Sequence, residues 1–406
     1  MSRNEKPAGR TKYDDVRQRG FSDRVSVEQA IDWLEAHASR LAAEQVAPDN
    51  AIGRVLAEVV EASTDMPPCD CAAADGYALR SDETIGASDY NPLLFEIQNA
   101  GDSLRPMGAA MVAAGMRLPQ GADAVLSFGA SRVSGGVLEV YSSLAPGAGV
   151  ERGGQQTRAG TKIHSTGHVI RPQDAALLAS LGMEHVTVAG QPRVRLVVAG
   201  AKPIAKSQTT RDADGPLLQA LIKRDGGVIE SVISRADERE AIRRSMAPPG
   251  PDVIVAAGRT GVGHDDEAPL TIAEIGELAI HGVALRPGDS TAMGRVAGIP
   301  IVLLPGDPLA CFCAYELFAG RLIRRMGGRL PELPYAVREA EVRRKIVSTV
   351  GFVDVCQVRL VDGGVEPVGS AELSRLASAV CADGFVLVPA PLEGYAPGAR
   401  VAVHLY

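Results

Sequence analysis

Asp252–Asp266 reads DVIVAAGRTGVGHDD, and this stretch decides the fold of the middle of the chain. Its first six residues, 252–257, form a short apolar run rich in Val and Ile, which predicts a buried parallel strand. Gly258 then opens a loop with three glycines in six residues, so the backbone can turn sharply and expose its N–H groups. A loop of this kind after a strand of an open α/β sheet is a common place for an anionic ligand.

The loop ends in three polar residues, His264, Asp265 and Asp266. Carboxylates beside an anion-binding loop fit a site in which Mg²⁺ joins them to a phosphate. The alternative is a tight turn into a capped helix, with His264 in a capping role. The GxxGxG spacing differs from the GxGxxG dinucleotide fingerprint, and the sequence contains no GxxxxGK[ST] phosphate loop.

Composition bounds the class of protein. The chain has 406 residues, enough for roughly two to four domains, and its formal net charge of −7 argues against broad nucleic-acid binding. No apolar run reaches the length of a membrane span, and the N-terminus lacks the hydrophobic segment of a secretory signal. Residues 1–22 are therefore predicted to form a disordered tail. Six cysteines in a chain of this length do not make a disulfide framework, which favours a reducing cytoplasm.

Periodicity divides the rest of the chain into regions. Ser26-Val-Glu-Gln29 predicts a capping box that starts a helix over 26–44, and glycine-punctuated runs over 91–140 predict a small β-rich domain. The alternation that follows predicts a doubly wound α/β sheet, and the short strands after the linker 331–334 predict a small C-terminal β-barrel or sandwich. The alternating elements are strands over 194–200, 228–234, 252–257, 278–285 and 299–304, and helices over 216–224, 237–246 and 309–325.

Seven motifs, in order along the chain, resemble those of one family, the molybdopterin molybdenumtransferases, which include MoeA and the gephyrin E domain. The signature DMPPCDCAAADGYAL resembles the family's "P…SAMDGYA", and VGHDD matches the end of its glycine loop, "GGVSVGxxD". LRPGDS and LPGDPLA resemble "KPGKP" and "LPGNPVSA". The other three are LPQGADAV, VIRPQDAALLASLG and the closing SAELSRLASAVCADGFVLVP, and the resemblance covers nearly everything from residue 23 to residue 406.

The resemblance implies an elongated homodimer of four-domain subunits. Domain I, elongated and discontinuous, would comprise 23–50 and 149–190, and domain II, a β-rich insert, 51–148. Domain III, a MogA-like α/β ligand-binding domain, would comprise 191–330, and domain IV, a β-barrel, 331–406. In the implied reaction, adenylylated molybdopterin and molybdate combine with Mg²⁺, AMP is released, and molybdenum enters the dithiolene. Handover of the product to other cofactor-synthesis proteins or to molybdoenzymes is also implied, with no nucleic-acid or membrane partner.

The resemblance also assigns site residues by position. Asp75 and Asp266 stand where the family places carboxylates, so they are the candidate catalytic and Mg²⁺-binding residues, in domain II of one subunit and domain III of the other. Local sequence alone favours a turn-forming role for Asp75, which precedes Gly76. The candidate substrate-binding residues are Gly258, Arg259, Thr260, Gly261, Gly263, Arg286, Pro287, Gly288, Pro305, Gly306, Asp307, Pro308, Lys202 and Asp214.

Several of these positions depart from the family pattern. Lys202 replaces a family glutamate, and Asp214 and Asp307 replace asparagines. Asp289 replaces a basic residue, a loss of positive charge that Lys202 and Arg259 would restore. Two alternatives therefore stay open: a paralogue that binds molybdopterin or its metal-loaded form without inserting metal, and a scaffold that binds partner peptides. Lys202 is equally well explained as a solvated residue at a strand end.

Cysteine and histidine give few further candidates. The pairs Cys69/Cys71 and Cys311/Cys313 each abut a site motif, but no His or Cys partner stands at zinc-finger spacing, so packing explains them better than metal binding. Among the histidines, only His264 is a candidate site residue.

Overall fold

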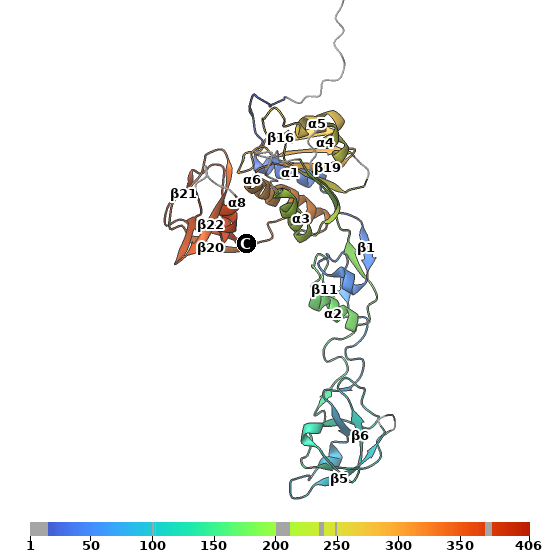
Figure 1. The fold of residues 1–406 in the computed structure, drawn as a ribbon. Coiled ribbons are helices and arrows are strands. Elements are labelled where there is room, and N and C mark those ends of the chain that lie inside the picture. The colour runs from blue at the N-terminus through green and yellow to red at the C-terminus, as the bar shows by residue number, and fades with distance from the viewer. Residues whose placement is uncertain are drawn as a thin grey trace, which may run out of the picture. The chain divides into compact units, whose positions relative to one another are not determined.

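The computed structural model describes residues 15–99, 101, 103–199, 212–234, 239–247, 250–369 and 376–406. Its contacts separate the chain into two compact units, and the two are described here one at a time (Figure 1). Unit 1 comprises 1–45, 53–57 and 187–406, and unit 2 comprises 46–52 and 58–186. The predicted Lys202 lies outside the described residues.

Unit 1 is built on a six-stranded sheet of order β14-β13-β15-β19-β18-β16. The four strands β13, β14, β15 and β19 run parallel, and β18 and β16 are antiparallel additions at one edge. All five residues of β15 are buried, as an apolar run in a central parallel strand requires. The strands are β13 (Arg193–Val198), β14 (Val228–Ser234), β15 (Val253–Ala257), β16 (Glu277–His281), β18 (Ala292–Val296) and β19 (Ile299–Leu304).

Helices cover both faces of this sheet, because successive strand residues point to opposite sides. Val253 and Val255 of β15 belong to a core shared with α1, α3, α6 and α7, whereas Ile254 and Ala256 belong to a core shared with α4 and α5. The predicted doubly wound architecture is therefore confirmed. The helices are α1 (Val27–His37), α3 (Asp214–Arg224), α4 (Arg239–Met246), α5 (Ala268–Ile275), α6 (Pro308–Ala314) and α7 (Gly320–Met326), with a π-helical turn, Tyr315–Ala319, between the last two.

Two predicted boundaries in unit 1 were wrong. The capping box at Ser26 forms, but the helix ends at His37 instead of continuing to residue 44, and β1 (Ala43–Val46) follows it. The predicted strand over 278–285 is divided at Gly282, whose φ of +95° ends β16. The last residue of the predicted strand, Leu285, starts β17 (Leu285–Arg286), which pairs with β22 of the C-terminal sheet.

The C-terminal part of unit 1 is a sheet of order β17-β22-β24-β26-β20, with β23 paired to β22. An isolated bridge between Val342 and Val365 links the end of β20 to β23. Full closure into a barrel stays a prediction. The elements are β20 (Ala336–Glu341), β21 (Ile346–Val347), β22 (Val353–Val361), β23 (Gly364–Pro367), α8 (Leu376–Val380), β24 (Gly384–Val388), β25 (Gly394–Tyr395) and β26 (Arg400–Leu405).

The N-terminal segment differs from the predicted tail. From Asp15 onward it is packed on unit 1: the N–H of Gln18 donates to the carbonyl oxygen of Val262 at 2.7 Å, and the Phe21 ring lies edge-on to His281 at 4.9 Å. This packing was not predictable from the sequence, because the segment is held by irregular polar and aromatic contacts, which leave no periodic pattern.

Unit 2 has a six-stranded sheet of order β7-β4-β6-β5-β9-β8. Its apolar face centres on Phe95, Leu79 and Leu138, all fully buried. The sheet strands are β4 (Gly76–Leu79), β5 (Leu93–Gln98), β6 (Gly108–Val112), β7 (Ala124–Ser127), β8 (Arg132–Ser134) and β9 (Val137–Val140). The remaining elements are β2 (Val60–Glu61), β3 (Cys71–Ala72), β10 (Val150–Glu151), β11 (Lys162–His164) and α2 (Pro172–Ser180), and β12 (Val186–Ala189) ends in unit 1. No helix among the described residues has the length and apolar character needed to cross a bilayer.

Candidate active site

The carboxyl ends of three neighbouring parallel strands meet at one edge of the central sheet. Strands β14 and β15 lie on opposite sides of β13, so the chain reverses its direction across the sheet at this point, which is where open α/β sheets bind ligands. Gly258 follows β15, and its N–H donates to the carbonyl oxygen of Leu304 at the end of β19, at 3.0 Å. A Cβ added at Gly306 would lie 3.2 Å from Cα of Gly258, so the two loops touch backbone to backbone.

The glycine loop is wrapped around the carboxylate of Asp266. Oδ2 of Asp266 accepts a hydrogen bond from the N–H of Gly263 at 2.7 Å. Cβ atoms added at Gly261 and Gly263 would lie 2.8 and 2.9 Å from this same oxygen, so only glycine fits at either position without a shift. Asp266 is thus fixed by its own loop. The tight turn, which was the alternative to a metal site, accounts for one of its two carboxylate oxygens.

Two other residues of the loop are held inward. Arg259 adopts a left-handed backbone, with φ of +61°, and its Nη1 donates to the carbonyl oxygen of Asp265 at 3.2 Å. Thr260 is buried, and its hydroxyl lies 3.1 Å from that of Ser290. The imidazole of His281 also contacts the carbonyl oxygen of Thr260, at 2.9 Å. These contacts stiffen the loop and link it to the segment before β18.

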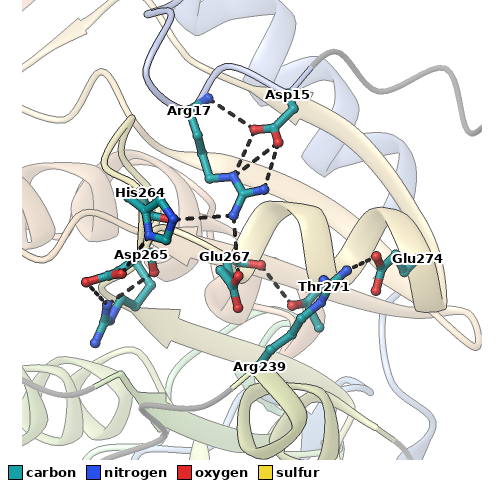
Figure 2. Close-up of polar contacts among 9 residues, drawn as sticks. Asp15, Arg17, Arg239, His264, Asp265, Glu267, Thr271 and Glu274 are labelled. Carbon is teal, nitrogen blue, oxygen red and sulfur yellow. Dashed lines mark hydrogen bonds and ion pairs between the residues drawn. The ribbon is translucent and has the colours of Figure 1, made fainter.

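The N-terminal segment adds charge to the outer side of this loop (Figure 2). Arg17 is paired with Asp15 at 2.8 Å, and its Nη1 reaches both the carbonyl oxygen of His264 and the carboxylate of Glu267, each at 3.4 Å. Glu267 precedes α5, so Arg17 joins the N-terminal segment to the end of the loop.

A cleft of about 850 Å³ lies within unit 1, beside the loops after β17 and β19. This volume is in the range of small-molecule sites. One wall comes from the end of β17 and the loop after it, Arg286 to Asp289, with Asp307 and Ala310 at the start of α6, and the other from the C-terminal sheet. The second wall consists of Arg344, Lys345, Ile346, Val347, Phe352, Asp354, Val355, Cys356, Gln357, Pro367, Val368 and Gly369.

The cleft carries three cationic side chains, Arg286, Arg344 and Lys345. Arg286 lies 3.8 Å from the buried carboxylate of Asp354 and donates to the hydroxyl of Thr349. Arg344 and Lys345 are exposed at the cleft wall. Burial, followed by the charge of Asp354, raises the pKa of the Cys356 thiol to about 12, so this cysteine lines the cleft as a neutral thiol at physiological pH.

The acidic departures in the loops have local partners. Asp289 forms an ion pair with Arg24 at 2.8 Å, so a residue of the N-terminal segment offsets its negative charge. Asp307 caps α6 by accepting from the N–H groups of Leu309 and Ala310, at 3.1 and 3.0 Å. An asparagine caps a helix equally well, so replacing the family asparagine by Asp307 does not change the cap of α6.

Asp214 is a buried carboxyl group in the first turn of α3. Burial, followed by the charges of Asp212 and Asp307, raises its pKa to about 7. Its Oδ1 is buried and has no hydrogen-bond partner among the described residues.

Asp75 belongs to unit 2, where it stands in the turn between β3 and β4. Its Oδ1 accepts from the N–H of Ala114 at 2.8 Å, and its carbonyl oxygen accepts from the N–H of Phe128 at 3.2 Å. The residue is exposed, so it both shapes the turn and presents a carboxylate to solvent.

Unit 1 thus brings together three groups of predicted residues: the glycine loop, 286–288 and 305–308. Sequence reasoning missed the opposite wall of the cleft, above all Arg344 and Lys345. The adjacent basic residues 343–345 were visible in the sequence, but they belong to none of the motifs, and only the pairing of β17 with β22 brings them to the cleft.

Comparisons with known proteins agree with this architecture. Three family models match consecutive parts of the chain: "MoeA N-terminal region (domain I and II)" over residues 25–182, "Probable molybdopterin binding domain" over 182–325, and "MoeA C-terminal region (domain IV)" over 339–406. Proteins named molybdopterin molybdenumtransferase are 26% identical to the chain, one from Staphylococcus aureus over 402 residues and one from Bacillus subtilis over 407. The alignments cover 94% of this chain and 95% and 94% of those relatives.

Solved structures show the same likeness. A crystal structure of the molybdopterin biosynthesis MoeA protein from Pyrococcus horikoshii matches with a TM-score of 0.71 and 27% identity, covering 94% of this chain and 99% of that one. A second structure of that protein matches with a TM-score of 0.67 and 25% identity. The fold and the cleft define a multidomain α/β protein with a small-molecule site at the sheet edge. The chain belongs to the MoeA family, the molybdopterin molybdenumtransferases.

Proposed function

We propose that the chain is a molybdopterin molybdenumtransferase, which inserts molybdate into adenylylated molybdopterin and releases AMP. The observation that carries the proposal is the cleft of about 850 Å³, with cationic side chains on both walls, beside two loops at the carboxyl ends of the parallel strands. Molybdate and the phosphate groups of the pterin substrate are anions, which such an edge suits.

The residues of the cleft divide into two roles. Arg286, Arg344 and Lys345 supply positive charge for the phosphates, and a guanidinium can bind phosphate through two parallel hydrogen bonds. The apolar side chains of Ile346, Val347 and Phe352 give the ring systems of the substrate a surface that excludes water. The glycine loop and 305–308 lie at the strand ends beside this cleft, where their backbone holds the reacting end of the substrate.

The donor set of the loop fits Mg²⁺, which prefers oxygen ligands and commonly shares them with substrate phosphates. Asp266 would hold the ion on the domain III side, because its carboxylate is already oriented by Gly263. Asp75 would hold it from domain II, as an exposed carboxylate fixed by Ala114. When bound, Mg²⁺ would supply positive charge to the phosphate oxygens.

The family resemblance implies that Asp75 and Asp266 act from different subunits, so the proposal includes a homodimer. We also place the reaction in the cytoplasm, because all six cysteines are free thiols, as expected in a reducing compartment.

The test is AMP release by the purified full chain from adenylylated molybdopterin with Mg²⁺, with and without molybdate. Molybdate-dependent AMP release, with molybdenum retained in the pterin, is the expected result. Tight binding of adenylylated molybdopterin with no AMP release under any condition would overturn the proposal and favour a protein that only binds the cofactor. Replacing Arg344 and Lys345 by Ala is expected to weaken substrate binding by roughly tenfold, as the loss of partly solvated charge contacts would.

A further inference from the structure

Two histidines and an aspartate meet in unit 2, within the region 162–174, which contains none of the residues that the proposed function uses. His164 ends β11, His168 follows four residues later, and Asp174 stands in the first turn of α2. One ligand atom from each residue lies within 4.8 Å of the other two. Among the described residues, this is the group of three potential ligands that comes closest to the geometry of a metal site.

The local backbone creates this arrangement. The N–H of His168 donates to the carbonyl oxygen of Ser165 at 3.2 Å, and Gly167 has φ of +88°, so residues 165–168 form a tight turn that requires glycine in its third position. The turn places the two imidazoles parallel, with ring centroids 3.8 Å apart and planes 6° apart. Both Nε2 atoms therefore point the same way, toward the carboxylate of Asp174.

Both imidazoles contact the carboxylate of Asp174, and the contact of His168 is a hydrogen bond. Nε2 of His168 lies 2.7 Å from Oδ2 of Asp174, and Nε2 of His164 lies 3.2 Å from Oδ1. The second contact lacks the geometry of a hydrogen bond, so Nε2 of His164 is a buried nitrogen without a hydrogen-bond partner in the part of the chain that the structure describes. A buried polar atom of this kind costs free energy unless something satisfies it.

We propose that His164, His168 and Asp174 form a binding site for a divalent transition-metal ion of the Zn²⁺ class, with water as the fourth ligand. The H-x₃-H spacing is typical of zinc ligands, and three protein ligands with an open fourth position are typical of a tetrahedral site. Imidazole and carboxylate donors favour Zn²⁺ over Mg²⁺, which distinguishes this site from the magnesium proposed at Asp266.

Arg171 contacts Asp174 through two groups, its backbone N–H and its guanidinium. The N–H of Arg171 donates to Oδ2 at 2.9 Å and orients the carboxylate, as outer partners of metal ligands do. The Arg171 guanidinium also pairs with Asp174, with Nη2 2.9 Å from Oδ1, and this pairing holds the pKa of Asp174 well below its usual range. The guanidinium competes with a cation, but its side chain is 55% exposed, so it can turn into solvent at small cost.

The bound ion would join β11 to α2. His164 is paired through β11 with β2, and Asp174 begins α2, whose Leu178 is fully buried. A ligand that binds only the folded form raises the melting temperature, so Zn²⁺ should stabilise unit 2 against heat.

The experiment is calorimetric titration of Zn²⁺ into the full chain after treatment with a chelator, in the presence of excess Mg²⁺. We expect one tight site per chain, weakened at least about 100-fold in both His164→Gln and His168→Gln, because losing a ligand costs more than losing an outer partner. The matched control is His185→Gln, which removes an exposed histidine of the same unit and should leave the affinity unchanged. Co²⁺ in place of Zn²⁺ should show the visible bands of a four-coordinate site in wild type and in His185→Gln, but not in His164→Gln or His168→Gln.

A variant that should bind Zn²⁺ more tightly than wild type distinguishes metal binding from a role of these residues in packing alone. Arg171→Ala removes the competing guanidinium, so it should bind Zn²⁺ roughly two- to fivefold more tightly, the equivalent of one exposed ion pair. Circular dichroism before metal addition checks that each variant is folded, and if the histidine variants unfold, Arg171→Ala and the Co²⁺ spectrum decide. Wild-type binding weaker than about 10 µM, or equal affinity in wild type and both histidine variants, would overturn the site.

Discussion

At the scale of single residues, Asp214 shows how a departure from the family pattern changes physical behaviour. Its carboxyl is buried beside Asp212 and Asp307, and its pKa is raised to about 7 from an ordinary value of 3.8. The folded state therefore binds a proton that the unfolded state has lost at pH values between these two. Because the folded state binds more protons there, stability falls as pH rises through this window.

We predict that Asp214→Asn, which restores the family residue, stabilises the chain at pH 8 by at least about 1 kcal/mol and changes little near pH 4. The neutral amide carries no charge to bury, so the variant should not lose stability between these pH values as wild type does. Urea unfolding at the two pH values, followed by the fluorescence of Trp33 in unit 1, measures the difference. Asp362→Asn, in an exposed turn, is the control, and an equal gain there or a gain at pH 4 would contradict the prediction.

Asp266 offers a test at the reacting end of the site. We predict that Asp266→Asn lowers Mg²⁺-dependent AMP release by at least about tenfold, because an amide is a weaker ligand for Mg²⁺ than a carboxylate. The fold should persist, since the amide oxygen can still accept from the N–H of Gly263. Asp265→Asn, one residue earlier and exposed, should retain most activity. Full turnover in Asp266→Asn would remove this residue from the chemistry, and a fall of several degrees in Tm would favour its role in the turn.

At the scale of elements, the glycine loop is the junction of three strand ends. Gly258 has φ of +89°, and a Cβ there would lie 2.8 Å from the carbonyl oxygen of Ala199, so an L-residue meets both backbone strain and a clash. Gly298, between β18 and β19, has φ of +84° but no heavy atom within 4 Å of an added Cβ. A comparison of the two glycines therefore separates the cost of backbone strain from the cost of the steric clash.

We predict that Gly258→Ala destabilises unit 1 by about 2–4 kcal/mol, whereas Gly298→Ala costs only about 1 kcal/mol, the strain alone. Denaturant unfolding followed by Trp33 fluorescence compares the two variants. Gly258→Ala should also weaken anion binding at the loop, and Gly298→Ala should not. Equal destabilisation in the two variants would show that the contact with Ala199 is relaxed without cost.

Single helices and strands were the part of the fold that could be predicted from the sequence. The apolar run at 252–257, the capping box at Ser26 and the helix after Pro308 depend on local spacing, and the structure has all three. The cleft depends on pairing between distant segments: Arg286 reaches Arg344 and Lys345 only because β17, which follows β16 along the chain, pairs with β22 of the C-terminal sheet. Similarly, Arg24 neutralises Asp289, but it lies in a segment without hydrophobic periodicity. The stacking of His164 on His168 requires a turn, which the sequence shows only as Gly167.

At the scale of the whole molecule, the proposed site needs residues of both units. Asp75 stands in unit 2 and Asp266 in unit 1, and the family resemblance assigns them to opposite subunits of a homodimer. In a twofold dimer each subunit would give Asp75 to one site and Asp266 to the other. Light scattering during size-exclusion chromatography should therefore show a dimer, and a monomer at micromolar concentration would contradict a shared site.

We predict that two inactive variants restore activity to each other. Asp75→Asn and Asp266→Asn homodimers should each be nearly inactive, because every site lacks one carboxylate. In a mixed dimer, one site has lost both carboxylates, but the other takes Asp266 from the Asp75→Asn subunit and Asp75 from the Asp266→Asn subunit. Random exchange makes half of the dimers mixed, so an equal mixture should recover about a quarter of wild-type AMP release. Subunits exchanged in mild denaturant and then refolded together provide the sample, and each variant treated alone is the control. If the mixture stays as inactive as its components while light scattering still shows dimers, the two carboxylates act within one chain.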